Sequence, residues 1–255
     1  MHSDSSPATH PAKVVVVTGA GSGLGRAMAI GLLNAGHHVV LAGRNDNSLT
    51  AAAADHERAT VHATDVSSEA SVVSLFAAVE ARFGRLDVLV NNAGTFGPKG
   101  SIDEIDAGAW SETVAVNLTG VFLCTREAVR IMKAQNPRGG RIVNNGSISA
   151  HTPRPASVAY TATKHGVSGL TKSTSLDGRD FDICCSQIDI GNAATDMTTG
   201  FATSSRQADG SMLAEPTFDP RHVADLVVQL VGLPLDVNVP TLTVMANRMP
   251  YVGRG

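Results

Sequence analysis

Residues 14–25 read VVVVTGAGSGLG and place four valines directly before a glycine-rich turn. A run of β-branched residues without alternation is typical of a parallel strand that is buried on both faces. The glycines stand at positions 19, 21, 23 and 25, and a helical pattern follows from Arg26 to Asn34. Between a strand and a helix, such a turn lets backbone N–H groups and the helix N-terminus face a pyrophosphate. The stretch therefore predicts a dinucleotide site, although the alternative is that these glycines only form a turn between the strand and the helix.

The spacing of the glycines selects one pattern. G-x-G-x-x-G would require a glycine where Leu24 stands, whereas Thr-Gly-x-x-x-Gly-x-Gly fits from Thr18 to Gly25. The predicted cofactor contacts of this turn are Gly19, Ser22, Gly23, Leu24 and Gly25.

Strand and helix patterns alternate along the rest of the chain. The predicted strands are 14–17, 38–42, 60–63, 86–90, 141–145, 183–190 and 239–245. The predicted helices are 26–34, 46–57, 72–83, 110–135, 157–179 and 220–231. This alternation predicts an α/β, doubly wound Rossmann-like fold with a seven-stranded parallel sheet and helices on both faces.

No linker or repeat divides the chain, so residues 13–255 are predicted to form a single domain. Residues 1–12 are predicted to be a flexible tail because they are rich in Ser, Pro, His and Thr. Residues 193–216 show little pattern, and we expect them to be a mobile substrate lid.

The composition excludes several classes of protein. A net charge of −3 over 255 residues argues against a nucleic-acid surface. No apolar run reaches the length of a membrane span, and the first 13 residues lack the apolar core of a signal peptide. The three cysteines and nine histidines show no metal-ligand spacing, so no metal is predicted. An odd number of cysteines without a framework favours a reducing compartment, and we expect the cytoplasm.

The second strand ends in Leu41-Ala42-Gly43-Arg44. Chains that bind NAD usually carry an acidic residue there for the ribose 2′-hydroxyl, whereas an arginine suits a 2′-phosphate. Arg44 therefore favours NADP. A solvated arginine is the alternative, which leaves NAD possible, and Ser22 in the turn adds no second positive charge.

Ser147, Tyr160 and Lys164 form the candidate catalytic group. Tyr160 and Lys164 are four residues apart in a helical pattern, so they share one helix face. A phenol has a pKa near 10, and a nearby ammonium lowers it toward the range useful for acid–base catalysis. We expect Ser147 to hold the substrate oxygen beside the phenol. A half-buried tyrosine and a solvated lysine are the alternative reading of the pair alone.

Together these motifs resemble the classical short-chain dehydrogenase/reductase family, from about residue 13 to the C-terminus. The resemblance implies that Tyr160 is the general acid–base, that Lys164 binds the nicotinamide ribose, and that Ser147 polarises the substrate oxygen. It also implies that Asn117 is a fourth catalytic residue, which holds a water for a proton relay. A polar residue that kinks its helix through local bonds is the alternative for Asn117.

The same resemblance implies further cofactor contacts. Asp65 and Val66 match the adenine site, and Asn92, Ala93 and Gly94 match the segment on the adenosine side. Ile190, Gly191 and Thr195 match the nicotinamide segment, in which the family usually has Pro-Gly-x-x-x-Thr. Isoleucine replaces that proline here, which puts the rigidity of the turn in question.

The expected function is an oxidoreductase that transfers a hydride between NADP(H) and a small secondary alcohol or carbonyl compound. The alternatives are an NAD-dependent enzyme of the same family, a non-catalytic dinucleotide-binding regulator, or a non-redox member such as a dehydratase. The substrate walls would come from residues 95–100, the loop after Ser147 and residues 193–216. These segments carry few charges, apart from His151 and Arg154, and suggest an uncharged or weakly polar substrate. The resemblance also implies a homodimer or homotetramer through the helices at 110–135 and 157–179.

Overall fold

The computed structural model describes residues 11–198 and 204–251. Seven parallel strands form one twisted sheet in the order β3-β2-β1-β4-β5-β6-β9. Their bounds are β1 Val14–Thr18, β2 His38–Gly43, β3 Ala59–Ala63, β4 Val88–Asn91, β5 Gly140–Asn145, β6 Ile183–Ile190 and β9 Thr241–Val244. The chain moves outward from β1 to β3 and returns to continue on the other side from β4, which confirms the doubly wound fold class.

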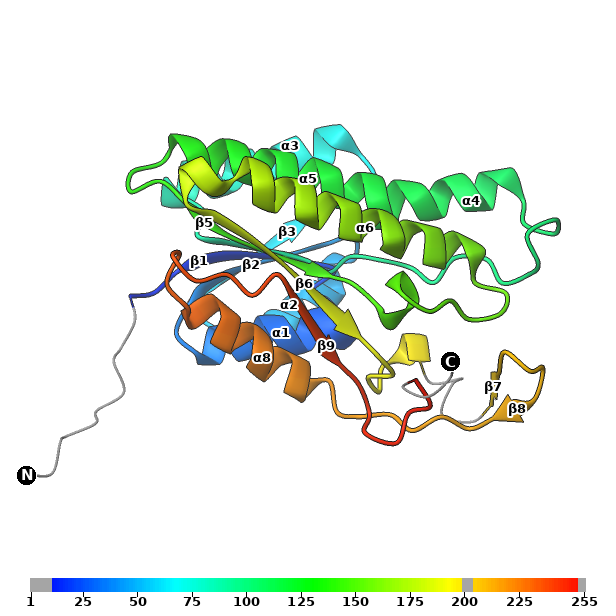
Figure 1. The fold of residues 1–255 in the computed structure, drawn as a ribbon. Helices are drawn as coiled ribbons and strands as arrows, with labels where there is room; N and C mark the ends of the chain where they lie inside the picture. The colour runs from blue at the N-terminus through cyan, green and yellow to red at the C-terminus, as the bar shows by residue number, and fades with distance from the viewer. Residues whose placement is uncertain (1–10, 199–203, 252–255) are drawn as a thin grey trace, which may run out of the picture.

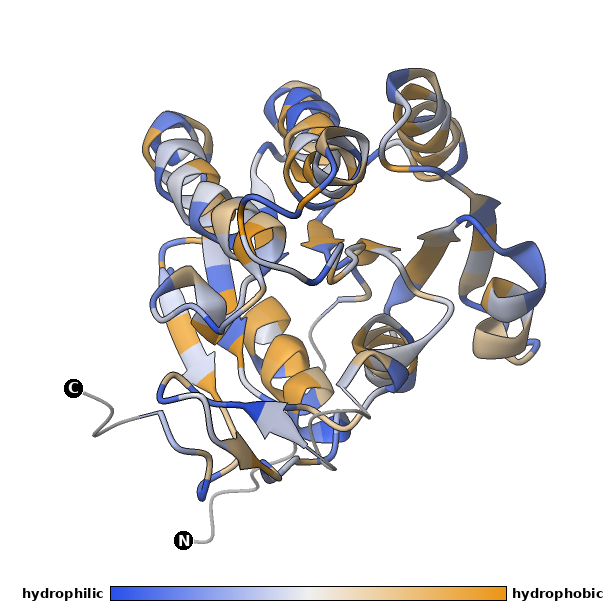
Figure 2. Cartoon of the chain, turned by 90° about the vertical axis from the view of Figure 1, so that its right-hand side faces the viewer, coloured by the Kyte–Doolittle hydropathy of each residue, from blue (hydrophilic) through white to orange (hydrophobic). Residues whose placement is uncertain are grey.

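Helices cover both faces of this sheet (Figure 1). One face carries α3 Glu69–Phe83, α4 Ala107–Val114, α5 Gly120–Ala134 and α6 Val158–Asp177. The other face carries α1 Gly23–Asn34, α2 Asp46–Ala53 and α8 Arg221–Gly232. Figure 2 shows the helices turning apolar sides toward the sheet, as a buried parallel sheet requires.

The first strand explains why its sequence is an unbroken apolar run. Val15 and Val17 belong to the core cluster that includes α1 and α8. Val14 and Val16 belong to the cluster on the opposite face, which includes α3 and α5. Successive side chains of a strand point to opposite faces, so both sets are buried and each valine contributes roughly 1.5–3 kcal/mol.

Two predicted helices differ from the structure. The helix predicted for 46–57 ends at Ala53, because Ala54 and Asp55 adopt positive φ values of 45° and 55°. The single helix predicted for 110–135 is α4 and α5 joined by a π-helix at Ala115–Thr119. A π-helix inside an α-helix is frequently found at functional sites.

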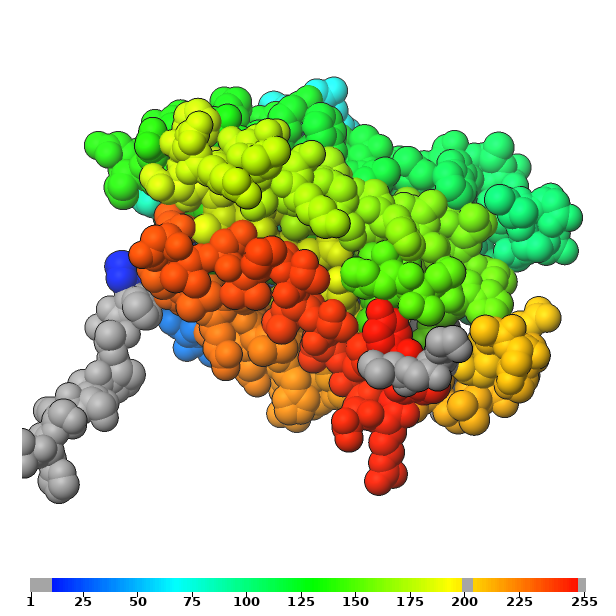
Figure 3. Space-filling view, in the orientation of Figure 1, coloured from blue at the N-terminus to red at the C-terminus, as the bar shows by residue number. Residues whose placement is uncertain are grey.

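The segment predicted to be unpatterned contains a small hairpin of β7 Ser205–Arg206 and β8 Met212–Leu213. Arg154, in the loop after β5, donates hydrogen bonds to Ser205 and to the buried Glu215. Figure 3 shows the hairpin in gold at the end of the molecule beside the green segment that follows β5. Residues 199–203 of the predicted lid and residues 1–10 of the predicted tail lie outside the described residues.

Candidate active site

A cleft of about 980 Å³ opens at the carboxyl edge of the sheet, where the loops after β1, β2, β4, β5 and β6 meet. In doubly wound sheets ligands bind at this edge, where the strand order reverses. Every residue predicted to contact a cofactor lines this one cleft. They are Gly19, Ser22, Gly23, Leu24, Gly25, Arg44, Asp65, Val66, Asn92, Ala93, Gly94, Tyr160, Lys164, Ile190, Gly191 and Thr195.

The glycine-rich turn leaves room and open donors for an anionic group. A Cβ at Gly25 would lie 2.1 Å from the carbonyl oxygen of Gly19, so no larger residue fits where the helix start approaches the turn. Gly19 itself has a φ of +64°, and a Cβ there would lie 2.9 Å from Ala93 Cα. Helix α1 begins at Gly23 with no side-chain cap and no acidic residue in its first turn. Its first N–H groups therefore remain available to a phosphate, which is what a dinucleotide requires.

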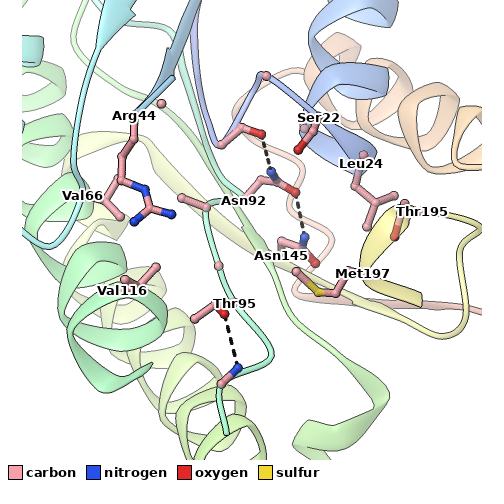
Figure 4. A pocket seen from close by; sticks show the side chains of 18 of the residues that line it. Ser22, Leu24, Arg44, Val66, Asn92, Thr95, Val116, Asn145, Thr195 and Met197 are labelled. Carbon is pink, nitrogen blue, oxygen red and sulfur yellow. Dashed lines mark hydrogen bonds between the residues drawn. The ribbon is translucent and has the colours of Figure 1, made fainter. Parts of the chain in front are cut away.

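Arg44 lies at the other end of the cleft, close to Val66 (Figure 4). Hydrogen bonds from Ser67 lower the pKa of Asp65, and the Arg44 charge lowers it further. Arg44 and Asp65 are therefore near enough to interact. This part of the cleft offers a cation and a carboxylate to the groups of an adenosine.

Two asparagines connect the glycine-rich turn to Lys164 on helix α6. The Asn92 amide donates to the carbonyl oxygens of Thr18 and Gly19 at 3.0 and 3.3 Å, and its oxygen accepts from Asn145 Nδ2 at 2.8 Å. Figure 4 shows Asn92 between the turn and Asn145. The backbone oxygen of Asn145 then accepts a hydrogen bond of 2.6 Å from Lys164 Nζ. The relative placement of turn and lysine is thus fixed through two side chains, those of Asn92 after β4 and Asn145 at the end of β5.

The phenol of Tyr160, which lines the cleft, meets Ser147, which lies outside the cleft lining. Burial raises the pKa of the Tyr160 phenol, and a hydrogen bond with Ser147 and the charge of Arg154 oppose this effect. The net shift of this pKa is therefore upward, opposite to the lowering that the sequence predicts from Lys164. Spacing along a helix identifies neighbours, but the cost of burying a charge depends on the whole surroundings.

Lys164 is buried, with 6% of its surface exposed. Its Nζ lies 5.5 Å from the centre of the Tyr160 ring, so the two side chains do share one face of α6 as predicted. Burial lowers the pKa of Lys164 to about 8, and the carboxylate of Asp189 opposes that shift.

Asn117 is 1% exposed and stands in the π-helix. Its side-chain oxygen accepts from Thr95 N at 2.8 Å, and its amide donates to Thr95 O at 2.7 Å. A weaker bond of 3.3 Å reaches Thr163 on α6. Asn117 therefore bonds to distant segments rather than locally, and it fixes the loop that borders the cleft after β4. Neither Asn117 nor Ser147 lines the cleft itself.

The turn after β6 is ordered although Ile190 replaces proline. Gly191 N donates to Val244 O at 2.8 Å, and Ala194 N donates to Phe218 O at 2.8 Å. Thr195 lies against the glycine-rich turn, because a Cβ at Gly23 would be 3.5 Å from Thr195. Pairing with β9 thus supplies the rigidity that the sequence left in question.

Sequence reasoning missed several residues of the site. Phe96 stacks on the Tyr160 ring with centroids 5.0 Å apart and an interplanar angle of 18°. Asn145, described above, was assigned only to a strand end. Asp189 is fully buried and accepts a hydrogen bond from the backbone N–H of Ser147. Nothing in the local pattern marks these residues, because each acts on a partner that is distant in sequence.

Within residues 11–198 and 204–251, no cluster of three or more histidine, cysteine or acidic side chains is arranged to hold a metal ion. Over the same ranges, no helix is long and apolar enough to cross a membrane.

Comparison with known proteins identifies the family. A family model described as short chain dehydrogenase matches residues 13–205. The chain is 39% identical over 190 residues to a 3beta-hydroxysteroid dehydrogenase of Mediterraneibacter gnavus, covering 73% of this chain and 68% of that protein. It is 38% identical over 192 residues to a cis-4-hydroxycyclohexanecarboxylate dehydrogenase of Sinomonas cyclohexanicum, covering 74% and 76%.

Solved structures agree with this assignment. A 3-ketoacyl-(acyl-carrier-protein) reductase from Brucella melitensis complexed with NADH has a TM-score of 0.83 at 28% identity, covering 92% of this chain and 98% of that chain. An actinorhodin polyketide ketoreductase with NADPH has a TM-score of 0.83 at 29% identity, covering 94% and 98%. The chain belongs to the short-chain dehydrogenase/reductase family and is an NAD(P)-dependent oxidoreductase that acts on hydroxyl or carbonyl groups.

Proposed function

We propose that this enzyme interconverts a ring ketone and the matching secondary alcohol with NADP(H). The observation that carries the proposal is the placement of Tyr160, Lys164 and Arg44 in one cleft. The first two stand at the reacting end, where Ser147 bonds to the phenol, and Arg44 stands at the adenosine end. When bound, the nicotinamide ring supplies or accepts the hydride, and the chain supplies binding, orientation and the proton.

The protein groups have separate roles in this proposal. Tyr160 donates a proton to the oxygen formed in ketone reduction, and takes it back in alcohol oxidation. Ser147 bonds to the phenol and holds the substrate oxygen beside it. Lys164, anchored on Asn145 O, holds the nicotinamide ribose. Asn117 fixes the loop at Thr95 and, with the lysine, supports a proton relay.

The preference for NADP rests on Arg44. Its guanidinium is exposed at the end of β2 and faces the cleft, as a partner for a 2′-phosphate must be. The neighbouring carboxylate of Asp65 partly balances that charge and could instead accept a bond from a ribose hydroxyl. NAD-dependent turnover is therefore the competing proposal.

The substrate class is supported by names and by the wall of the site. Relatives at 38% and 39% identity are named for a hydroxycyclohexane and for a 3β-hydroxysteroid, and both names place the hydroxyl on a ring carbon. Phe96 provides a flat apolar surface against the Tyr160 ring. Ile148, Ala246 and Met249 form a small buried apolar cluster that includes the loop after Ser147. Residues 193–216 are proposed to close over the substrate as a lid.

The test is a panel of ketones followed by loss of the reduced-nicotinamide absorbance, with NADPH and NADH in parallel. Cyclohexanone, 4-oxocyclohexanecarboxylate and a 3-ketosteroid are compared with an open-chain β-ketoester. Faster turnover of a ring ketone with NADPH supports the proposal. Turnover of the open-chain ester alone contradicts the ring class, and no nicotinamide oxidation with any compound favours a regulator or a dehydratase.

We also propose that the enzyme is a homodimer or homotetramer in the cytoplasm. An apolar groove between α5 and α6 is lined by Leu118, Thr119, Phe122, Gly166, Gly169, Leu170 and Ser173. Phe122 is 46% exposed there, and a Cβ at Gly169 would meet nothing within 4 Å, which leaves room for a neighbouring helix. The three cysteines are free and buried, which is consistent with a reducing compartment. Sedimentation velocity of the full chain measures the oligomeric state.

A further inference from the structure

A buried carboxylate lies directly beneath the catalytic group. Asp189 is the penultimate residue of β6, and its side chain is fully buried. Its Oδ1 accepts from Ser147 N at 3.0 Å and from Gln187 Nε2 at 2.7 Å. Its Oδ2 lies 2.8 Å from His151 Nε2. Ser147 and Gln187 each donate an N–H group to this carboxylate, which therefore holds the end of β5 and its own strand together.

The backbone is shaped around this carboxylate. A Cβ at Gly146 would lie 2.1 Å from Asp189 Oδ1, so only glycine permits the contact next to Ser147. His151 belongs to the loop that follows Ser147, and 47% of its side chain is exposed. One aspartate thus ties the end of β6 to the residue before Ser147, to Ser147 itself and to the substrate loop.

The same carboxylate acts on both ionisable catalytic groups. Its negative charge raises the pKa of Tyr160 and that of Lys164. The other groups around it are few. On its own strand Gln187 is neutral, its β9 partner is Thr243, and Arg154 near Tyr160 is balanced by Glu215. His151 is the titratable group in direct contact.

We propose that Asp189, in contact with His151, is a positioning residue for the reaction: it fixes Ser147 through its backbone N–H and places a negative charge behind Tyr160 and Lys164. A protonated phenol is the form that donates to a carbonyl oxygen, and the phenolate is the form that takes the proton of an alcohol, so this charge should move the onset of alcohol oxidation to higher pH. The inference rests on the proposed role of Tyr160 as the acid–base group.

The charge can be removed with little change of shape. Asp189→Asn keeps an oxygen for Ser147 N and loses the negative charge, and Asp189→Ser is a smaller uncharged variant. Asp87→Asn is the matched control, because Asp87 also accepts a backbone N–H, from Val14 at 2.8 Å, and lies at the opposite edge of the sheet. Thermal unfolding first shows which variants are folded.

The titration of Tyr160 can be read without any substrate. The chain has two tyrosines, so Tyr251→Phe leaves Tyr160 as the sole phenol for an ultraviolet difference titration. In that background, Asp189→Asn should increase the acid dissociation constant of Tyr160 at least about threefold, because a like charge has been removed. Asp87→Asn should leave it unchanged. An unchanged or smaller constant in the folded Asp189 variants overturns the proposal.

The titration of Lys164 separates loss of charge from loosening of the site. Its reactivity with an amine reagent is followed against pH by mass spectrometry of the labelled peptide. Loss of the carboxylate charge should lower the pKa of Lys164 further, together with that of Tyr160. Loosening would expose both groups, and would raise the pKa of Lys164 toward its ordinary value while that of Tyr160 fell. A rise at Lys164 therefore overturns the charge role in favour of a structural one.

These measurements stand apart from the proposed function. If no ketone is turned over, the proposed function fails, and the two titrations still decide the role of Asp189. If ketones are reduced, the pH dependence of kcat/KM in the Asp189 variants provides a further test. The acidic limb of kcat/KM for alcohol oxidation should move to lower pH in Asp189→Asn, and an unmoved limb contradicts the proposal.

Discussion

The ion pair between Arg154 and Glu215 gives a prediction whose size follows from the structure. Glu215 is 2% exposed, and its carboxylate accepts from Arg154 at 2.9 and 2.5 Å, from Gln207 at 3.0 Å and from Asn192 at 2.7 Å. These residues come from the loop after β5, the turn after β6 and the segment around the hairpin. The pair therefore joins the segments that we propose as the walls of the substrate site.

The magnitude comes from the pKa of Glu215. Burial by itself raises this pKa, but the bonds from Arg154, Gln207 and Asn192 outweigh burial and lower it from 4.5 to about 2. In the unfolded chain Glu215 becomes protonated near its ordinary pKa of 4.5, whereas in the folded chain it stays ionised until the pH approaches about 2. The stabilisation is complete above the unfolded pKa and is lost as the pH falls from about 4.5 toward 2. At about pH 3 the contribution of Glu215 to the free energy of unfolding is smaller than at pH 7 by about 2 kcal/mol.

The assay is urea unfolding of the parent and of Glu215→Gln at pH 7 and at about pH 3. Between pH 7 and about pH 3, the free energy of unfolding should fall by about 2 kcal/mol less in the variant than in the parent. At pH 7 it should be less stable than the parent, because Arg154 is left buried without its counter-charge. Arg154→Gln combined with Glu215→Gln should recover part of that loss. Hydrogen exchange should report the loss first in residues 204–216.

An exposed pair provides the control. Hydrogen bonds from Arg221 lower the pKa of Asp219 to about 2, but this carboxylate is at the surface. Its contribution should be small and should vanish at high salt, whereas the Glu215 contribution should persist. If Glu215→Gln kept the full pH dependence of the parent, the carboxylate would not be the depressed group, and the reasoning would be refuted.

Three further predictions concern the cofactor and the assembly. Arg44→Ala should weaken NADPH by roughly 1.5–3 kcal/mol and leave NADH nearly unchanged in a fluorescence titration; equal losses would remove the 2′-phosphate assignment. Lys164→Ala should reduce cofactor affinity and turnover together, and Lys164→Arg should rescue poorly because the buried site is built for a compact amine. Phe122→Glu should shift the sedimenting species to a smaller one at unchanged thermal stability; an unchanged species would place the subunit contact elsewhere.

Much of the fold follows from local pattern. The run at β1 and the run at β6 are buried on both faces, and β6 has the predicted bounds Ile183–Ile190. The glycine-rich turn has the predicted strand before it and the predicted helix after it. Local chemistry is sufficient for these elements because burial on both faces leaves a continuous apolar signature.

The differences arise where distant partners decide. The π-helix at Asn117 accompanies bonds to Thr95, which is 22 residues away. The strands of the hairpin are two residues long, and Arg154 from another loop anchors them. Neither the π-helix nor the hairpin produces a hydrophobic periodicity that could be detected in the sequence.

The site shows the same division. The residues of the cofactor cleft could be predicted in part from motifs, and all predicted cofactor residues line one cleft, whereas Phe96, Asn145 and Asp189 carried no such signal. The direction of the Tyr160 pKa shift could not be predicted in the same way, because it depends on burial and on the charge of Asp189, which is distant in sequence. A motif identifies a residue from its neighbours in sequence, whereas the pKa of its side chain depends on the burial and charges that the whole fold places around it.

The most direct test of the central claim is single-turnover hydride transfer by Tyr160→Phe, measured beside an NADPH titration. The substitution keeps the ring and its stacking on Phe96 but removes the only group proposed to move the proton. NADPH affinity should stay close to that of the parent, because the turn and Arg44 are intact. Hydride transfer to a ketone that the parent reduces should fall by roughly 10²–10⁴-fold. Near-normal transfer in this variant would contradict the assignment of Tyr160 as the acid–base group.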